Sequence, residues 1–284
     1  MTEATGPQEL HYRIGSPALG HFPGHHRSTR GDSGFEFRRH AVLLDAPDVR
    51  RLDLHASLRD PFGNWIVRVH SQRMAIRVVM VADLSASMGF AGPRRKLDTL
   101  AHFVDSLAWS AWRTGDSFGF IGCDSAVRED LLLPPTHSRG LADALAGRLR
   151  TLQPQGRSAD ALAAAHRYLS RQRSLVFLVS DFHLPLPGIE AALASLAHHE
   201  LVPVVLWDPL EFGLSARSGL VQVADPETGN TRLVWWRPAL RERWLAARHQ
   251  RRDDLLRIFR AYRLRPLFME NGFEADAVTR HFHS

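Results

Sequence analysis

The hydrophobic pattern divides the chain into two stretches. In the first, three short segments alternate apolar and polar residues, which is typical of half-buried strands. They lie at residues 35–40, 51–55 and 65–70. We therefore predict a small β-rich region over residues 35–75. Residues 1–34 are rich in Gly, Pro, Ser and His and show little periodicity, so we expect an irregular lead-in there.

From residue 76 onward, uninterrupted apolar runs alternate with segments of helical period. The apolar runs predict strands at 76–83, 117–123, 126–132, 175–179, 202–207 and 264–269. The amphipathic segments predict helices at 96–112, 141–152, 159–172, 188–199, 238–262 and 274–282. A hairpin is expected at 220–236, with its turn at 226–230. This order predicts one α/β domain over 76–284: a doubly wound, mostly parallel sheet with helices on both faces.

The composition is that of an ordinary soluble globular protein, with 44% hydrophobic and 23% charged residues. No apolar run approaches the ~18 residues that a membrane span needs. The N-terminus lacks the apolar core of a signal peptide. The single cysteine, Cys123, fits a reducing compartment. We therefore expect a cytoplasmic protein with no membrane partner.

The net charge is +6, and the basic residues are nearly all arginine, concentrated in the predicted helix at 238–262. Glu242, Asp253 and Asp254 are interspersed among them, which favours a solvated helix face over a nucleic-acid site. A nucleic-acid binder using this helix stays open as an alternative, although this pattern does not favour it. The residues predicted to contact a protein partner are Arg248, Arg252 and Trp236.

The candidate chemistry lies where predicted parallel strands end. Asp83, Ser85 and Ser87 form a D-x-S-x-S motif directly after the strand at 76–83, and Asp181 follows the strand at 175–179. Ser158 stands between them, at the start of a predicted helix. The carboxyl edge of a parallel sheet is where ligands bind, and carboxylate and hydroxyl oxygens suit Mg²⁺ or a similar ion. These five residues are the predicted metal ligands.

Two other interpretations of these residues remain open. Asp and Ser after strands are also ordinary turn formers and helix caps, which would make the cluster structural. A magnesium-dependent phosphoester enzyme using Asp83 and Asp181 is a second alternative, with Asp124 and Asp208 at further strand ends. No Walker loop, G-x-S-x-G elbow or G-x-G-x-x-G motif is present, and no base is evident. We therefore expect a protein that is not an enzyme.

The D-x-S-x-S motif with a later hydroxyl and a later strand-end acid resembles the metal-ion-dependent adhesion site of von Willebrand factor A-type domains. The resemblance assigns Asp83, Ser85, Ser87 and Asp181 to metal binding, with Ser158 where the family has threonine. The preceding segment, from Gly34 through Val67-Arg68, resembles that of the MoxR-associated family known as domain of unknown function fifty-eight. Short members of that family occur in methanol-oxidation gene clusters.

This resemblance implies a partner and no reaction. Members of the family are similar to accessory subunits encoded with MoxR-type AAA+ ATPases and thought to act in maturation or metal insertion of a client complex. A divalent metal held at Asp83 to Ser87, most simply Mg²⁺, would accept a carboxylate from the ATPase or from the client. Such an ion with one open position exchanges a water for the incoming oxygen.

Overall fold

The computed structural model describes residues 6–14, 23–27, 36–71, 73–90, 92–212, 219–224 and 230–283. The chain forms two compact units. The larger unit comprises Met1–Tyr12, Arg77–Arg113 and Ser117–Ser284, and the smaller comprises Arg13–Ile76 and Thr114–Asp116.

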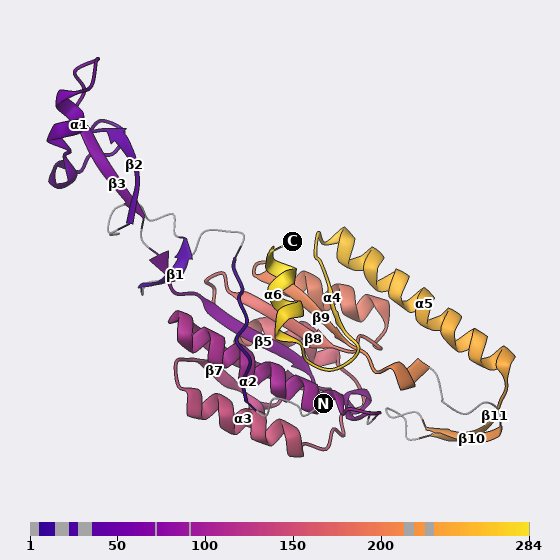
Figure 1. Ribbon diagram of the computed structural model, residues 1–284. Helices are drawn as coiled ribbons and strands as arrows, with labels where there is room; N and C mark the ends of the chain where they lie inside the picture. The colour runs from indigo at the N-terminus through magenta and orange to yellow at the C-terminus, as the bar shows by residue number, and fades with distance from the viewer. Residues whose placement is uncertain are drawn as a thin grey trace. The chain divides into compact units, whose positions relative to one another are not determined.

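The larger unit is built on a six-stranded sheet in the order β12-β9-β8-β5-β6-β7 (Figure 1). Its strands are β5 (Arg77–Asp83), β6 (Ser117–Cys123), β7 (Leu133–Thr136), β8 (Leu175–Ser180), β9 (Glu200–Leu206) and β12 (Leu267–Met269). All neighbouring strands are parallel except β7, which runs antiparallel to β6. β8 is buried along its whole length and β5 from its second residue, because both lie inside a covered sheet. The predicted α/β class is confirmed.

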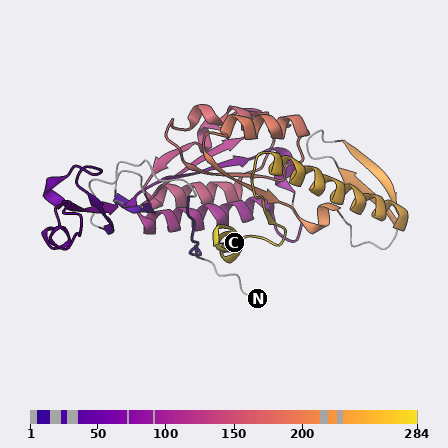
Figure 2. The ribbon, with the colours of Figure 1, turned by 90° about the horizontal axis from the view of Figure 1, so that it is seen from above.

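Helices cover both faces of this sheet (Figure 2). They are α2 (Lys96–Thr114), α3 (Arg139–Thr151), the 3-10 helix η4 (Asp160–Tyr168), α4 (Leu186–Leu196), α5 (Pro238–Ala261) and α6 (Ala275–His283). On one face, Val79 and Val176 belong to an apolar cluster with η4, α4 and α5. On the other face, the Phe177 ring meets Phe103 of α2 and Phe282 of α6, with ring centroids 5.3 Å and 6.1 Å apart.

Two predicted elements of the larger unit are different in the structure. The strand expected at 126–132 is replaced by a 3-10 helix, η3 (Glu129–Leu131), and the chain pairs only afterwards, as edge strand β7. The helix expected at 159–172 is the shorter 3-10 helix η4, whose N-cap residue is Ala159, so Ser158 does not cap it. In both places tertiary packing decided between conformations that the local pattern left close in energy.

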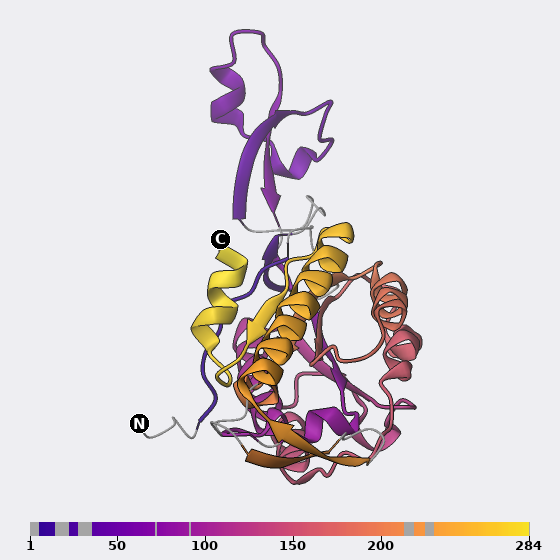
Figure 3. The same ribbon diagram turned by 90° about the vertical axis from the view of Figure 1, so that its right-hand side faces the viewer.

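The hairpin and the long arginine-rich helix are present as predicted. β10 (Gly219–Ala224) pairs antiparallel with β11 (Thr231–Trp236), and most of the predicted turn lies outside the described residues. Helix α5 follows β11 directly (Figure 3). The indole of Trp236 packs edge-on against Trp244, with ring centroids 5.4 Å apart. No helix among the described residues is long and apolar enough to cross a membrane.

The N-terminal segment of the larger unit is an ordered part of its packing. Leu10 is 1% exposed, and its backbone N–H donates to the Ser110 hydroxyl of α2 at 3.0 Å. The N–H of Gln8 donates likewise to Ser106. Residues 6–14 form no helix or strand, as expected for the irregular lead-in over residues 1–34, whereas residues 23–27 form a strand and correct that expectation. Residues 1–5, 15–22 and 28–35 lie outside the described part of the chain.

The smaller unit has two antiparallel strand pairs, separate from the main sheet. They are β1 (Pro23–Arg27) with β4 (Arg73–Met74), and β2 (Glu36–Val42) with β3 (Ile66–Ser71). The strand expected at 51–55 is wrong. A 3-10 helix, η1 (Val49–Arg51), and a short helix, α1 (Leu54–Leu58), stand there. Asp53 caps α1 through N–H groups of His55 and Ala56, which explains the break in the strand pattern.

Candidate metal-binding site

The two strand-end acids lie at one edge of the sheet. β5 and β8 are parallel neighbours in which Ala82 pairs with Val179, so both strands end at the same level. Asp83 is the last residue of β5, and Asp181 directly follows β8. Each is 1% exposed. Asp83 and Asp181 therefore share the carboxyl edge of the sheet.

Asp83 is surrounded by neutral donors, which together with it we name the hydroxyl cluster (Asp83, Ser85, Ser87 and Ser180). One carboxylate oxygen accepts the backbone N–H of Ser85 at 2.8 Å, and the other accepts the Ser180 hydroxyl at 2.6 Å. The hydroxyls of Ser85 and Ser87 lie 3.2 Å apart. Ser87 sits in the 3-10 turn η2 (Ala86–Gly89), which folds the motif back on the strand end.

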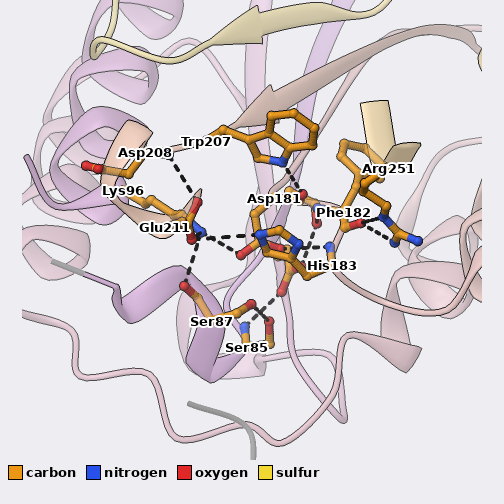
Figure 4. Close-up of polar contacts among 12 residues, drawn as sticks. Ser85, Ser87, Lys96, Asp181, Phe182, His183, Trp207, Asp208, Glu211 and Arg251 are labelled. Atoms are coloured by element: carbon orange, nitrogen blue, oxygen red, sulfur yellow. Dashed lines mark hydrogen bonds and ion pairs between the residues drawn. The ribbon is translucent and has the colours of Figure 1, made fainter. Parts of the chain in front are cut away.

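Asp181 lies instead against a buried lysine, and we name this group the ion-pair cluster (Lys96, Asp181 and Glu211; Figure 4). The Lys96 ammonium is 2.7 Å from Asp181 Oδ2 and also pairs with a carboxylate oxygen of Glu211. It donates in addition to the Ser87 carbonyl at 3.3 Å. Lys96 is the first residue of α2, and Glu211 comes from η5 (Pro209–Phe212), after β9.

These surroundings move the two carboxyl pKa values in opposite directions. Burial, followed by the nearby charge of Asp181, raises the pKa of Asp83 to about 6, against the hydrogen bonds from Ser180 and Ser85. Burial also acts to raise the pKa of Asp181, but the Lys96 ammonium is the largest opposing influence, and this pKa falls to about 2. At neutral pH Asp181 is thus fully ionised, whereas Asp83 takes up a proton at a much higher pH than Asp181 does.

An imidazole stands beside the ion-pair cluster. Ligand atoms of Asp181, His183 and Glu211 lie within 4.8 Å of one another. The His183 ring stacks on Trp207, with an interplanar angle of 3° and ring centroids 6.4 Å apart. The Trp207 indole N–H in turn donates to the Asp181 backbone carbonyl at 2.8 Å. The aromatic stack thereby fixes the loop that carries both Asp181 and His183.

The turn after β8 is held in a sparsely populated conformation. Phe182 has a φ of +51°, which is unusual for a residue with a side chain. Its N–H donates to the Ser180 hydroxyl at 2.8 Å, and its carbonyl accepts from the Arg251 guanidinium of α5. Arg251 also donates to the carbonyl of Leu184. These contacts supply the constraint that such a backbone needs.

The loop carrying Ser158 is brought to the same edge by its backbone. The Gly156 carbonyl accepts the N–H of Ala86 at 2.8 Å, and Gly156 forms a bridge with Ser85. A Cβ on Gly156 would lie 2.4 Å from the Asp124 side chain, so only glycine permits this approach. Among the described residues, no hydrogen bond joins the half-buried Ser158 to the hydroxyl cluster. Its role as a ligand stays a prediction.

The donor set suits a hard divalent cation. Two buried carboxylates and two facing hydroxyls supply only oxygen, as Mg²⁺ prefers. One Asp181 oxygen, however, already accepts from the Lys96 ammonium. A cation bound here would therefore be held by Asp83, Ser85, Ser87 and Asp181, and it would meet that ammonium.

Sequence reasoning missed four residues of this site: Lys96, Ser180, His183 and Glu211. The sequence did contain one indication of Lys96. Among the 36 basic residues of the chain, Lys96 is the only lysine. Ser180 was visible beside Asp181 at the strand end. Glu211 had no local signal, because it reaches the site only through the order of strands in the sheet.

The residues predicted to contact a partner are engaged within the chain. Trp236 is 1% exposed, so the prediction that it contacts a partner needs correction, since its indole packs inside the fold. Arg248 and Arg252 each pair with Glu270 at 2.8 Å. The Arg252 guanidinium also lies over the Phe268 ring, 4.0 Å from its centroid.

Comparison with known proteins gives a family and several similar chains. Residues 45–254 match the family described as "Protein of unknown function DUF58". The chain is 37% identical over 103 residues to an uncharacterized protein in the moxR 3′ region of Paracoccus denitrificans, covering 35% of this chain and 94% of that one.

Two solved structures from Bacteroides are similar at a lower level. BatB from Bacteroides thetaiotaomicron is 15% identical, with a TM-score of 0.45 over 74% of this chain and 100% of that chain. An aerotolerance-related membrane protein from Bacteroides fragilis is 14% identical, with a TM-score of 0.47 over 74% of this chain and 97% of that chain.

Proposed function

The chain belongs to the DUF58 family of proteins of unknown function, and we propose that it is a non-catalytic, metal-dependent interaction module that works with a MoxR-type AAA+ ATPase. One observation carries this proposal: Asp83, Ser85, Ser87 and Asp181 gather at the carboxyl edge of β5 and β8. The proposed ion is Mg²⁺, and the proposed role is maturation of, or metal insertion into, a client complex. The proposed setting is the cytoplasm.

The physical basis is an incomplete coordination shell. Asp83 and Asp181 bring at most two negative charges, and Ser85 and Ser87 are neutral. A hard divalent ion with these ligands retains water, which a carboxylate from a partner replaces. Binding would then depend on both the ion and an acidic side chain of the partner. We assign the cluster no reaction, since its hydroxyls are paired with one another and with Asp83.

The choice of partner is supported by the relative from Paracoccus denitrificans, whose name places it in the moxR 3′ region. Proteins encoded side by side often act together, and a MoxR-type ATPase is therefore the first partner to test. The client complex is a separate question, to be approached through that ATPase. The nucleic-acid alternative is less favoured, because Arg248 and Arg252 of the arginine-rich helix are paired with Glu270.

The test is a pull-down from an extract of the source cell, with Mg²⁺ or with chelator, using wild type and Asp83→Asn. We expect a MoxR-type ATPase, identified by mass spectrometry, to be retained only by wild type with Mg²⁺. Asp53→Asn is the matched control, because Asp53 is a buried acid of the smaller unit, where it caps α1 through the N–H groups of His55 and Ala56. Retention that ignores both Mg²⁺ and Asp83→Asn would refute the proposal.

A further inference from the structure

A cation of the chain itself already contacts the proposed metal ligands. The Lys96 ammonium lies 2.7 Å from Asp181 Oδ2 and 3.3 Å from the Ser87 carbonyl oxygen. Lys96 is 3% exposed, so its charge is offset by protein groups and not by solvent. A positive charge therefore stands at the edge where a divalent ion is proposed to bind.

A second carboxylate of the chain, that of Glu211, lies within 4.8 Å of the Asp181 carboxylate. Glu211 pairs with the same ammonium, and its other oxygen accepts the backbone N–H of Asp208 at 3.1 Å. The Glu211 side chain is 10% exposed, and it comes from η5, outside the strands that carry the metal ligands. In chemistry and position it resembles the acidic side chain that a partner would bring.

The choice of lysine at this position has a physical reason. A compact ammonium has three donors that point in different directions, and here they meet Asp181, Glu211 and the Ser87 carbonyl. A planar guanidinium presents a fixed fork and is larger. In a chain that otherwise uses arginine for its basic side chains, the one lysine stands where a small cation is required.

Resting on the proposed metal-dependent function, we propose that Lys96 and Glu211 form an internal lock on the metal site. The ammonium competes with the divalent ion for Asp181, and the Glu211 carboxylate takes the place of the partner's acid. Loading the site with Mg²⁺ then requires that Lys96 leave Asp181. The locked chain binds metal weakly, and a partner that draws Glu211 away releases the site.

The structure offers the displaced side chain somewhere to go. Lys96 also lines a pocket of about 300 Å³ beside the site, together with residues of η5 and β12. Two other acids, Asp208 and Glu270, line the same pocket. Glu270 already pairs with Arg248 and Arg252, so an ammonium that leaves Asp181 moves toward the Asp208 carboxylate and not into an apolar cavity.

The single lysine provides a direct probe of the lock in the full chain. Growth on lysine labelled with ¹³C at the ε carbon gives one side-chain NMR signal, that of Lys96. We expect this signal to shift in step with Mg²⁺ binding measured by calorimetry. Mg²⁺ binding by calorimetry with an unchanged lysine signal would overturn the lock.

Variants test the competition itself. We expect Lys96→Met to bind Mg²⁺ at least about tenfold more tightly than wild type, a difference of about 1.4 kcal/mol. If the unpaired acids prevent folding, the double variant Lys96→Met/Glu211→Gln removes one charge of each sign and is measured in its place. Arg94→Met is the matched control: Arg94 lines the same pocket, and its loss should change the affinity by less than about twofold.

The outcomes separate this inference from the function on which it rests. Tighter Mg²⁺ binding by the Lys96 variants alone supports the lock. Equal or weaker binding by folded Lys96 variants refutes the lock and leaves the metal-dependent function standing. Absence of Mg²⁺ binding in wild type and in every variant refutes both.

Discussion

The hydroxyl cluster and the ion-pair cluster each place an aspartate at the same sheet edge, but the two aspartates contact different groups. Asp83 accepts from a backbone N–H and a serine hydroxyl, whereas Asp181 accepts from a buried ammonium in addition to the His183 backbone N–H. Each carboxylate is 1% exposed, so burial is equal and the partners decide the outcome. The pKa of Asp83 rises to about 6, and the pKa of Asp181 falls to about 2.

This difference shows that position at a sheet edge fixes where an acid lies but not what charge it keeps. Hydrogen bonds from neutral donors offset part of the desolvation free energy of the Asp83 carboxylate, but not all of it. The Lys96 ammonium compensates the charge of Asp181 and so makes it a permanent anion. Five predictions test this contrast, from the largest expected effect to the smallest.

The largest effect is expected on stability when the ion-pair cluster is broken. Asp181→Asn leaves the buried Lys96 with Glu211 as its carboxylate partner and with the Ser87 carbonyl, and removal of one partner from a buried ion pair costs about 3–5 kcal/mol. The measurement is the free energy of unfolding in urea at pH 7, with chelator present. Arg248→Met, at a half-buried pair with Glu270, is the control and should cost much less. A loss similar to that control would show that the Asp181 pair contributes little.

A smaller loss in the free energy of unfolding is expected when Asp83 of the hydroxyl cluster is replaced. Asp83→Asn keeps the shape of the side chain and one carbonyl oxygen, and it removes a charge that burial and Asp181 disfavour. We therefore expect the loss of one altered hydrogen bond, typically about 1–2 kcal/mol, to be largely offset. The same urea experiment in chelator measures it. A loss as large as that of Asp181→Asn would erase the contrast between the two clusters.

The pH dependence of metal binding should follow Asp83 and not Asp181. With a pKa of about 6, Asp83 takes up a proton as the pH falls through 6, and a proton competes with the metal for the same oxygens. Mg²⁺ affinity should therefore fall by up to about tenfold per pH unit below 6, as one competing proton requires. Calorimetry from pH 7 to pH 5 measures this. In Asp83→Asn any remaining affinity should lose that dependence.

The free energy of unfolding should change with pH in opposite directions through Asp83 and through Asp181. Because the pKa of Asp83 is raised, its protonation stabilises the metal-free fold at low pH, and this contribution is lost as the pH rises through 6. Because the pKa of Asp181 is lowered, its contribution is present at neutral pH and is lost as the pH falls below its ordinary value toward 2. Urea unfolding of Asp83→Asn and Asp181→Asn across this range separates the two.

The smallest effect is expected at Cys123, which pairs with Asp83 across β5 and β6. Burial, followed by the charges of Asp83 and Asp124, raises the pKa of this thiol to about 12. A thiol reagent at pH 8 should therefore not react with the folded chain and should react fully in urea. Addition of Mg²⁺ should leave that protection unchanged. Fast labelling of the folded chain would show that the hydroxyl cluster opens.

Much of the site was determined by sequence alone. The apolar runs at 76–83 and 175–179 specified buried strands, and parallel strands end at a common edge, so the local pattern is enough to bring Asp83 and Asp181 together once the strands are neighbours. The D-x-S-x-S motif also identified Ser85 and Ser87, although the turn η2, and not strand alternation, places them beside the end of β5. These are local patterns whose meaning depends only on the chain near them.

Only the tertiary structure determined which charged side chains lie beside Asp83 and Asp181. Lys96 and Asp181 are 85 residues apart, and Glu211 lies on a different connection again. Their meeting depends on the strand order β9-β8-β5 and on the way α2 returns to the sheet, which no local pattern encodes. The same holds for Ser158, whose loop is held beside Ser85 by backbone bonds of Gly156. The local sequence determined that Asp83 and Asp181 stand at the strand ends, and tertiary packing determined which charged side chains surround them.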